Sequence, residues 1–301
     1  ANVPVPTAQT YQDAGVNGTV NSADAASFTD ALATSFITGS SVNELSKLQT
    51  LVDSYRKFFA LADGPTNPTT APQLNTQDCV NLGVETSLLS NVNRERLFSD
   101  IVDRQSRTGI DTIAKINQLA IITNAVQDKA TSLASNYTLT ADDFTRLGVR
   151  GVSSSNLNVL LDAIGSARAE GSDTVQELQD LLFNNLNIQF NSISDDTGPS
   201  STDFITSDTQ LTFSGTSNAA DGTKIRINLK RGSDANAISL EGNVSNGQWQ
   251  VNSATLLSGD YTVSAQLFDG TSILPRVSTF GKHVMVDTSA DNRPDGSTDT
   301  D

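Results

Sequence analysis

The side chains with the clearest chemical potential are aspartates in the C-terminal third of the chain. Calcium, a hard cation, is bound by roughly six to eight oxygens from carboxylates, backbone carbonyls and water. These aspartates fall where a β-rich region begins and ends, so we predict that they are calcium ligands. Aspartate is also a frequent turn residue, and that interpretation stays open. The predicted metal-binding residues are Asp195, Asp196, Asp203, Asp208, Asp269 and Asp287.

Other chemistry is limited by the presence of one histidine and one cysteine. His283 is predicted to lie on a strand, partly exposed, and no GxSxG motif accompanies it to support a Ser-His-Asp triad. A zinc site is equally unsupported. The sequence therefore predicts no catalytic residue and no residue that binds an organic cofactor.

The net charge is −15 and the sequence pI is about 4.3. Such an acidic chain is not expected to bind nucleic-acid phosphates or an anionic membrane. It suits a self-repelling surface protein or one that binds divalent cations. No run approaches the roughly 20 apolar residues of a membrane span. The chain starts at Ala1 without methionine or a visible signal peptide, which indicates a mature form or an excised fragment.

One short motif recurs in the N-terminal part of the chain. Each occurrence ends in Gly-Val and should form a short helix that begins at a capping residue (Thr7, Asn75 or Thr140) and stops at the glycine. Cys79 occupies the position of Tyr11 and Phe144, so we predict a buried thiol. The occurrences read PTAQTYQDAGV, LNTQDCVNLGV and LTADDFTRLGV.

Two further helix patterns follow each motif. Middle helices are expected at about 23–33, 88–102 and 154–167, with Ser22, Ser87 and Ser153 as N-caps. A longer apolar helix pattern then starts at Val42, Ile113 or Val175. In the first of these, Leu45, Leu48, Val52, Tyr55 and Phe59 share one helical face. The regular spacing predicts an internal repeat with a period of about 60–70 residues.

Near residue 190 the apolar period changes from helical to alternating. Strands are expected at 210–216, 223–229, 237–242, 248–251, 261–268 and 277–286, with turn residues between them. This pattern is typical of an antiparallel β-sandwich of about 90 residues. Tyr261 is predicted to form a tyrosine corner. The expected core comprises Leu211, Phe213, Ile225, Ile227, Leu229, Trp249, Val251, Val263, Ala265 and Leu267.

The same region resembles a known module. The stretches DDTGPSSTDFITSDTQLTFSGT, GQWQV, LLSGDYTVSAQLFD and VMVDTSA resemble the bacterial Ig-like domains repeated in very large Gram-negative surface adhesins of the RTX or giant-adhesin type. After Asp269 this chain has GTSILPRVSTFGK where the family usually shows a Gly-Asn pair. The helical segments are more loosely similar to helical modules of giant proteobacterial surface proteins.

The resemblance implies calcium at the module junctions, with Asp196, Asp203, Asp208 and Asp287 matching the family pattern. Together these observations predict a multidomain α plus β protein. Residues 1–190 form an α-helical repeat array of about two and a half copies, residues 191–288 an antiparallel Ig-like β-sandwich, and residues 289–301 a polar tail or linker.

The predicted function is a non-enzymatic, extracellular spacer segment of a bacterial cell-surface adhesin, of the kind found in biofilms. Its partners would be neighbouring modules of the same or identical chains, with a host-surface or matrix ligand left undefined. No nucleic acid and no direct membrane insertion are expected. One alternative is a self-assembling subunit of a surface layer (S-layer) or extracellular filament. The other is an enzyme with an Ig-like accessory domain.

Overall fold

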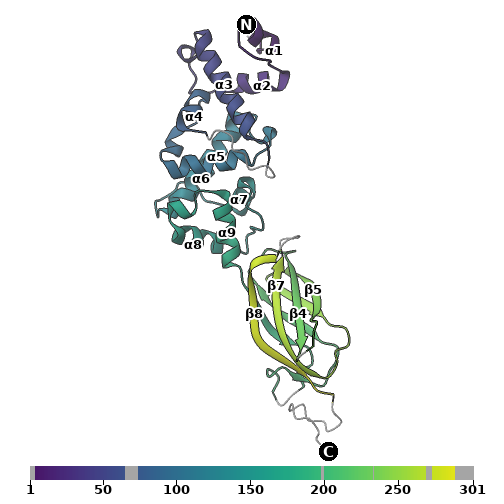
Figure 1. The fold of residues 1–301 in the computed structure, drawn as a ribbon. Coiled ribbons are helices and arrows are strands. Elements are labelled where there is room, and N and C mark those ends of the chain that lie inside the picture. The colour runs from purple at the N-terminus through teal and green to yellow at the C-terminus, as the bar shows by residue number, and fades with distance from the viewer. Residues whose placement is uncertain (1–3, 65–73, 198–199, 233, 269–272, 289–301) are drawn as a thin grey trace, which may run out of the picture. The chain divides into compact units, whose positions relative to one another are not determined.

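The computed structural model describes residues 4–64, 74–197, 200–232, 234–268 and 273–288. The chain divides into two compact units, which comprise residues 1–149 with 161–179 and residues 150–160 with 180–301. The first unit is helical and the second contains a β-sheet (Figure 1). The predicted α plus β class is therefore confirmed. None of the helices in the described ranges combines the length and apolar character needed to cross a membrane.

Three helical segments have the same order of elements: a short helix, a middle helix, a 3₁₀ helix and a long helix. The short helices are α1 (Ala8–Asp13), α4 (Thr76–Leu82) and α7 (Ala141–Leu147). The middle helices are α2 (Ser22–Leu32), α5 (Val92–Asp103) and α8 (Leu157–Ala167). The 3₁₀ helices are η1 (Gly39–Ser41), η3 (Arg107–Gly109) and η4 (Ala169–Gly171), with an additional η2 (Thr86–Leu89). The long helices are α3 (Leu45–Leu61), α6 (Ile113–Ala130) and α9 (Val175–Asn185).

The short helices share one set of end contacts. The predicted N-caps are confirmed, because each capping side chain accepts a hydrogen bond from the backbone N–H three residues later. At the other end a glycine with positive φ turns the chain. The valine after that glycine donates its N–H to the carbonyl of the buried residue in the helix. These bonds are Val16 to Tyr11 at 3.1 Å, Val84 to Cys79 at 3.0 Å and Val149 to Phe144 at 2.9 Å.

Two of the predicted caps of the middle helices are wrong. Asn21, not Ser22, caps α2, and Asn91, not Ser87, caps α5. In each case the asparagine side chain accepts from the backbone N–H three residues on. Asparagine and serine are comparable N-caps in isolation, so the choice depends on where tertiary packing starts the helix.

The long helices correct the predicted register of the first segment. Each begins four residues after the preceding 3₁₀ helix ends, which makes Leu45, Ile113 and Val175 equivalent positions. Val42, predicted to start this helix pattern, is the residue that follows η1. Ile113 and Val175 are buried, with exposed fractions of 2% and 1%, whereas Leu45 is 49% exposed. Leu45 was predicted to share a helical face with Val52 and Tyr55. Those two residues are buried, whereas Leu45 is exposed.

The second unit contains a curled, mostly antiparallel sheet of eight strands (Figure 1). The strands are β1 (Ile188–Ile193), β2 (Ile205–Thr206), β3 (Thr212–Ser217), β4 (Lys224–Arg231), β5 (Ile238–Ser245), β6 (Gln248–Asn252), β7 (Gly259–Phe268) and β8 (Ile273–Val286). Their order is β1-β3-β6-β5-β4-β7-β8-β2. Strand β5 joins the two halves, because residues up to Asn243 pair with β4 while Val244 and Ser245 pair with β6.

The alternating pattern located the six strands from β3 onward, and all ten predicted core residues are buried. It missed β1 and β2. A domain boundary between residues 190 and 191 would fall within β1, where Phe190 packs against Phe204, Phe213 and Trp249. The tyrosine corner is confirmed, since the Tyr261 hydroxyl donates to the carbonyl of Leu257 at 2.8 Å and accepts from its N–H at 3.1 Å.

Candidate functional site

The predicted calcium ligands gather around the short strand β2. Asp195 and Asp196 follow β1, Asp203 and Asp208 flank β2, and Asp287 follows β8. Thr206 connects three of these positions: its hydroxyl donates to the Asp195 carbonyl and accepts from the Asp208 N–H, and its carbonyl accepts from the Asp287 N–H. Asp269 lies outside the described residues, as does the polar tail at 289–301.

Asp196 is a partly buried carboxylate of this group. Its Oδ2 accepts from the Phe204 N–H at 3.2 Å, whereas its Oδ1 is buried without a hydrogen-bond partner. Burial raises the pKa of Asp196, and the neighbouring Asp203 adds to the rise, while the Phe204 hydrogen bond opposes it. An unpaired buried carboxylate oxygen fits a cation ligand. Within the described ranges, however, no group of three or more acidic, histidine or cysteine side chains is placed to hold a metal.

The single histidine forms a pair with an aspartate on the neighbouring strand. His283 lies on β8 with an exposed side chain, and its Nδ1 is 2.9 Å from Oδ2 of Asp260. Both partners lie on neighbouring antiparallel strands, since β7 pairs with β8. The contact is an exposed cross-strand pair of the kind that contributes little to stability.

Cys79 lies in the helical core, as predicted, with an exposed fraction of 1%. Burial raises the pKa of its thiol to about 12, and the carboxylates of Asp78 and Glu95 add to the rise. We expect Cys79→Ala to lower the free energy of unfolding by about 1–3 kcal/mol, because it leaves a small cavity. Chemical denaturation measures the loss. Rapid labelling of the native protein by a bulky maleimide would contradict the burial of this thiol.

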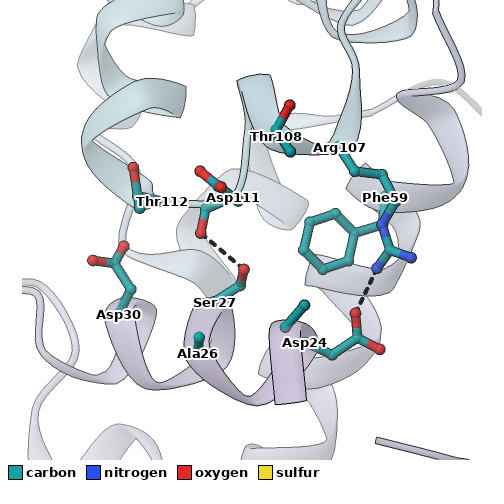
Figure 2. Close-up of a pocket in the computed structure, with 10 residues that line it drawn as sticks. Asp24, Ala26, Ser27, Asp30, Phe59, Arg107, Thr108, Asp111 and Thr112 are labelled. Carbon is teal, nitrogen blue, oxygen red and sulfur yellow. Dashed lines mark hydrogen bonds and ion pairs between the residues drawn. The ribbon is translucent and has the colours of Figure 1, made fainter. Parts of the chain in front are cut away.

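A pocket of about 350 Å³ lies in the helical unit between α2 and the turn that precedes α6 (Figure 2). On one side the Arg107 guanidinium lies 4.2 Å from the centroid of the Phe59 ring and pairs with Asp24 at 2.5 Å. On the other side the Ser27 hydroxyl donates to the Asp111 carbonyl at 2.8 Å. The sequence patterns did not predict this pocket, because its walls come from two segments.

The small side chains of α2 that line this pocket align with larger side chains in α5. Aligning Phe28 with Phe98 sets Ala23, Ala26 and Ser27 against Asn93, Arg96 and Leu97. The polar groups of the pocket hold the two segments together. Asp30 of the first segment accepts from the N–H of Ile113 of the second at 2.6 Å, whereas Asp111 pairs with Lys115 at 2.7 Å within the second segment. A carboxylate at the first N–H of a helix also stabilises the helix dipole.

The hydrogen bond from the first N–H of a long helix to an aspartate of the preceding segment also occurs between the second and third segments. Asp100 of α5 accepts from the N–H of Val175, the first residue of α9, again at 2.6 Å. In the first pair of segments the Tyr55 hydroxyl of α3 donates to the carbonyl of Ile110 at 3.1 Å. In the second pair Gln127 of α6 donates to the equivalent carbonyl, that of Ser172, at 2.8 Å.

A charged pair accompanies this second contact. Arg96 lies 3.4 Å from Asp173, whose side chain is almost completely buried. Burial raises the pKa of Asp173 to about 6, and Glu177 adds to the rise while Arg96 opposes it. In the helical unit, the turn that precedes the long helix of each later segment therefore packs against the middle helix of the segment before it.

Comparison with known proteins finds a similarity in the second unit. Residues 183–288 match the family described as "Bacterial Ig-like domain". No curated protein and no solved structure matches the chain. The match supports the Ig-like resemblance, and it begins at Phe183, so it includes β1 and the last residues of α9. The C-terminal part of the chain is thus similar to bacterial Ig-like domains.

Proposed function

We propose that this chain is a non-enzymatic structural segment of a bacterial cell-surface adhesin. The three helical segments are copies of one repeat that act as a spacer, and the β-unit is an Ig-like sandwich that extends it outside the cell. The observation that carries this proposal is the Bacterial Ig-like domain match at residues 183–288. The hydrogen bond from the Ile113 N–H to Asp30 recurs between the Val175 N–H and Asp100. This recurrence supports the repeat interpretation.

The use of the polar groups in the helical pocket favours a structural role. Asp24, Asp30 and Asp111 each have a partner within the helical unit, namely Arg107, the N–H of Ile113 and Lys115. A hydrolase would need a carboxylate poised toward substrate. Asp24 and Asp30 instead connect the first segment to the second, and Asp111 is paired within the second segment.

A replacement experiment tests the spacer function. In the bacterium that makes the protein, protease added to intact cells should remove this segment while a cytoplasmic marker survives. Replacing residues 183–288 by an unrelated Ig-like domain of equal length should preserve adhesion of the cells. Protection of the segment in intact cells would contradict the surface location. Loss of adhesion on equal-length replacement, with normal surface display, would show that the domain is itself a binding site.

Calcium binding is part of the same proposal. We expect calcium to raise the melting temperature of the β-unit, because an ion bound only to the native state stabilises it by mass action. Asp196→Ala with Asp287→Ala should abolish the shift. Asp234→Ala, in the exposed turn after β4, is the matched control and should leave it unchanged. An unchanged melting temperature and no binding heat by calorimetry would contradict a calcium site.

One observation favours a second candidate function, a self-assembling subunit of a surface layer or extracellular filament. Leu45 is 49% exposed at the position where Ile113 and Val175 are buried by the preceding segment. An apolar position that is covered in two segments and uncovered in the first suits a contact between chains.

A further inference from the structure

The contact between helical segments has two complementary sides. One side is a docking turn, which consists of a 3₁₀ helix and the residues up to the first residue of the long helix. The other side is an acceptor aspartate on the preceding middle helix. The docking turns are residues 39–45, 107–113 and 169–175, and the acceptor aspartates are Asp30, Asp100 and, by alignment, Asp162.

The alignment of Asp162 rests on the packing of its helix. Each acceptor aspartate follows a fully buried apolar residue by two positions, and these residues are Phe28, Phe98 and Leu160. Asp30 and Asp100 each accept a hydrogen bond from a backbone N–H of a docking turn. The Asp162 side chain is 83% exposed, and its carboxylate lies 3.9 Å from Lys129.

The first docking turn, residues 39–45, is also exposed and could contact such an aspartate. Its long helix, α3, begins after Glu44, whose side chain makes no capping hydrogen bond. Leu45 is 49% exposed, and Val42 is partly exposed where Ile110 is fully buried. One end of the array therefore presents an uncapped helix start beside apolar side chains, and the other end presents a carboxylate suited to cap it.

The charges at the two ends also match. In the second contact Arg96, four residues before Asp100, pairs with Asp173, two residues before Val175. On α8 and in the first docking turn the equivalent positions hold Asn158 and Asn43. Bringing these two surfaces together opposes two amides, and the charge of Glu44, the residue before Leu45, is paired with Lys47.

We propose that two copies of this chain associate head to tail, with the docking turn 39–45 of one molecule seated on α8 of the next. The Asp162 carboxylate caps the N–H of Leu45, and the Leu45 side chain becomes buried, as Ile113 and Val175 are within the chain. Because the two surfaces differ, the contact is heterologous and leaves an open end on each molecule, which permits chains of several copies. This inference deepens the second candidate function and does not depend on the spacer function.

Sedimentation velocity of the complete protein over a series of concentrations tests the proposal. We expect the wild-type protein to form a concentration-dependent series of species. Leu45→Glu and Asp162→Lys should each weaken association at least about tenfold, because they place a charge in an apolar contact or remove the capping carboxylate. The matched controls are Val92→Glu and Asp142→Lys, which change other exposed residues of the helical segments and should associate like the wild type.

Mixing the two variants identifies the contact. Leu45→Glu keeps an intact Asp162 end and Asp162→Lys keeps an intact Leu45 end, so the mixture should form pairs and nothing larger. A wild-type protein that stays monomeric up to its solubility limit would overturn both the contact and the self-assembly function. Assembly that survives both substitutions, or a mixture that forms no pairs, would overturn this contact alone. Unchanged melting curves of both variants show that the fold is intact.

Discussion

Replacing Gly215 by alanine should unfold the β-unit, with a loss of about 4 kcal/mol or more. Gly215 lies on β3 between Phe190 of β1 and Trp249 of β6. A Cβ at this position would lie 1.9 Å from the Gln189 carbonyl oxygen and 2.4 Å from Cζ2 of Trp249. Neither neighbour can move away, because one is backbone in a strand and the other is a ring with an exposed fraction of 2%.

The fluorescence of Trp249 reports this effect directly, since it is the one tryptophan of the chain. Gly222→Asn is the matched control. Gly222 has φ of +83°, which asparagine tolerates, and a Cβ there would meet nothing within 4 Å. The control should retain the native emission and melting temperature. A Gly215→Ala protein with native Trp249 fluorescence would show that β1 and β6 do not approach β3 as described.

Phe98→Ala should destabilise the helical unit by about 3–5 kcal/mol. Phe98 is 1% exposed in α5, and its ring meets that of Phe58 edge to face with centroids 6.1 Å apart. Truncation removes this contact and leaves a cavity that the surrounding helices fill only in part. Chemical denaturation followed by the helical circular dichroism signal measures the loss.

Phe36→Ala makes the same chemical change at a surface position, since Phe36 is 59% exposed. It should alter the stability of the helical unit by no more than about 0.5 kcal/mol. Equal losses for the two variants would mean that Phe98 is not a core residue.

Local sequence patterns were sufficient to predict the elements that depend on interactions between residues close in the chain. The caps Thr7, Asn75 and Thr140 act on N–H groups three residues away, and the glycine stops need only a positive φ. The alternation of apolar residues located the strands from β3 onward and their ten core residues, because one face of each strand must be buried. The tyrosine corner is equally local, spanning Leu257 to Tyr261.

The missed strands depend on partners far along the chain. The pairing of β2 with β8 joins Ile205 to Met285, and no local period marks a strand of two residues. The docking of Ile113 on Asp30 and of Val175 on Asp100 likewise links separate segments. The helical period placed Leu45 on an apolar face, but burial of that position requires a preceding segment to cover it. Composition and period therefore determined the elements and their inner faces, whereas only the tertiary structure decided which faces are covered and which remain exposed.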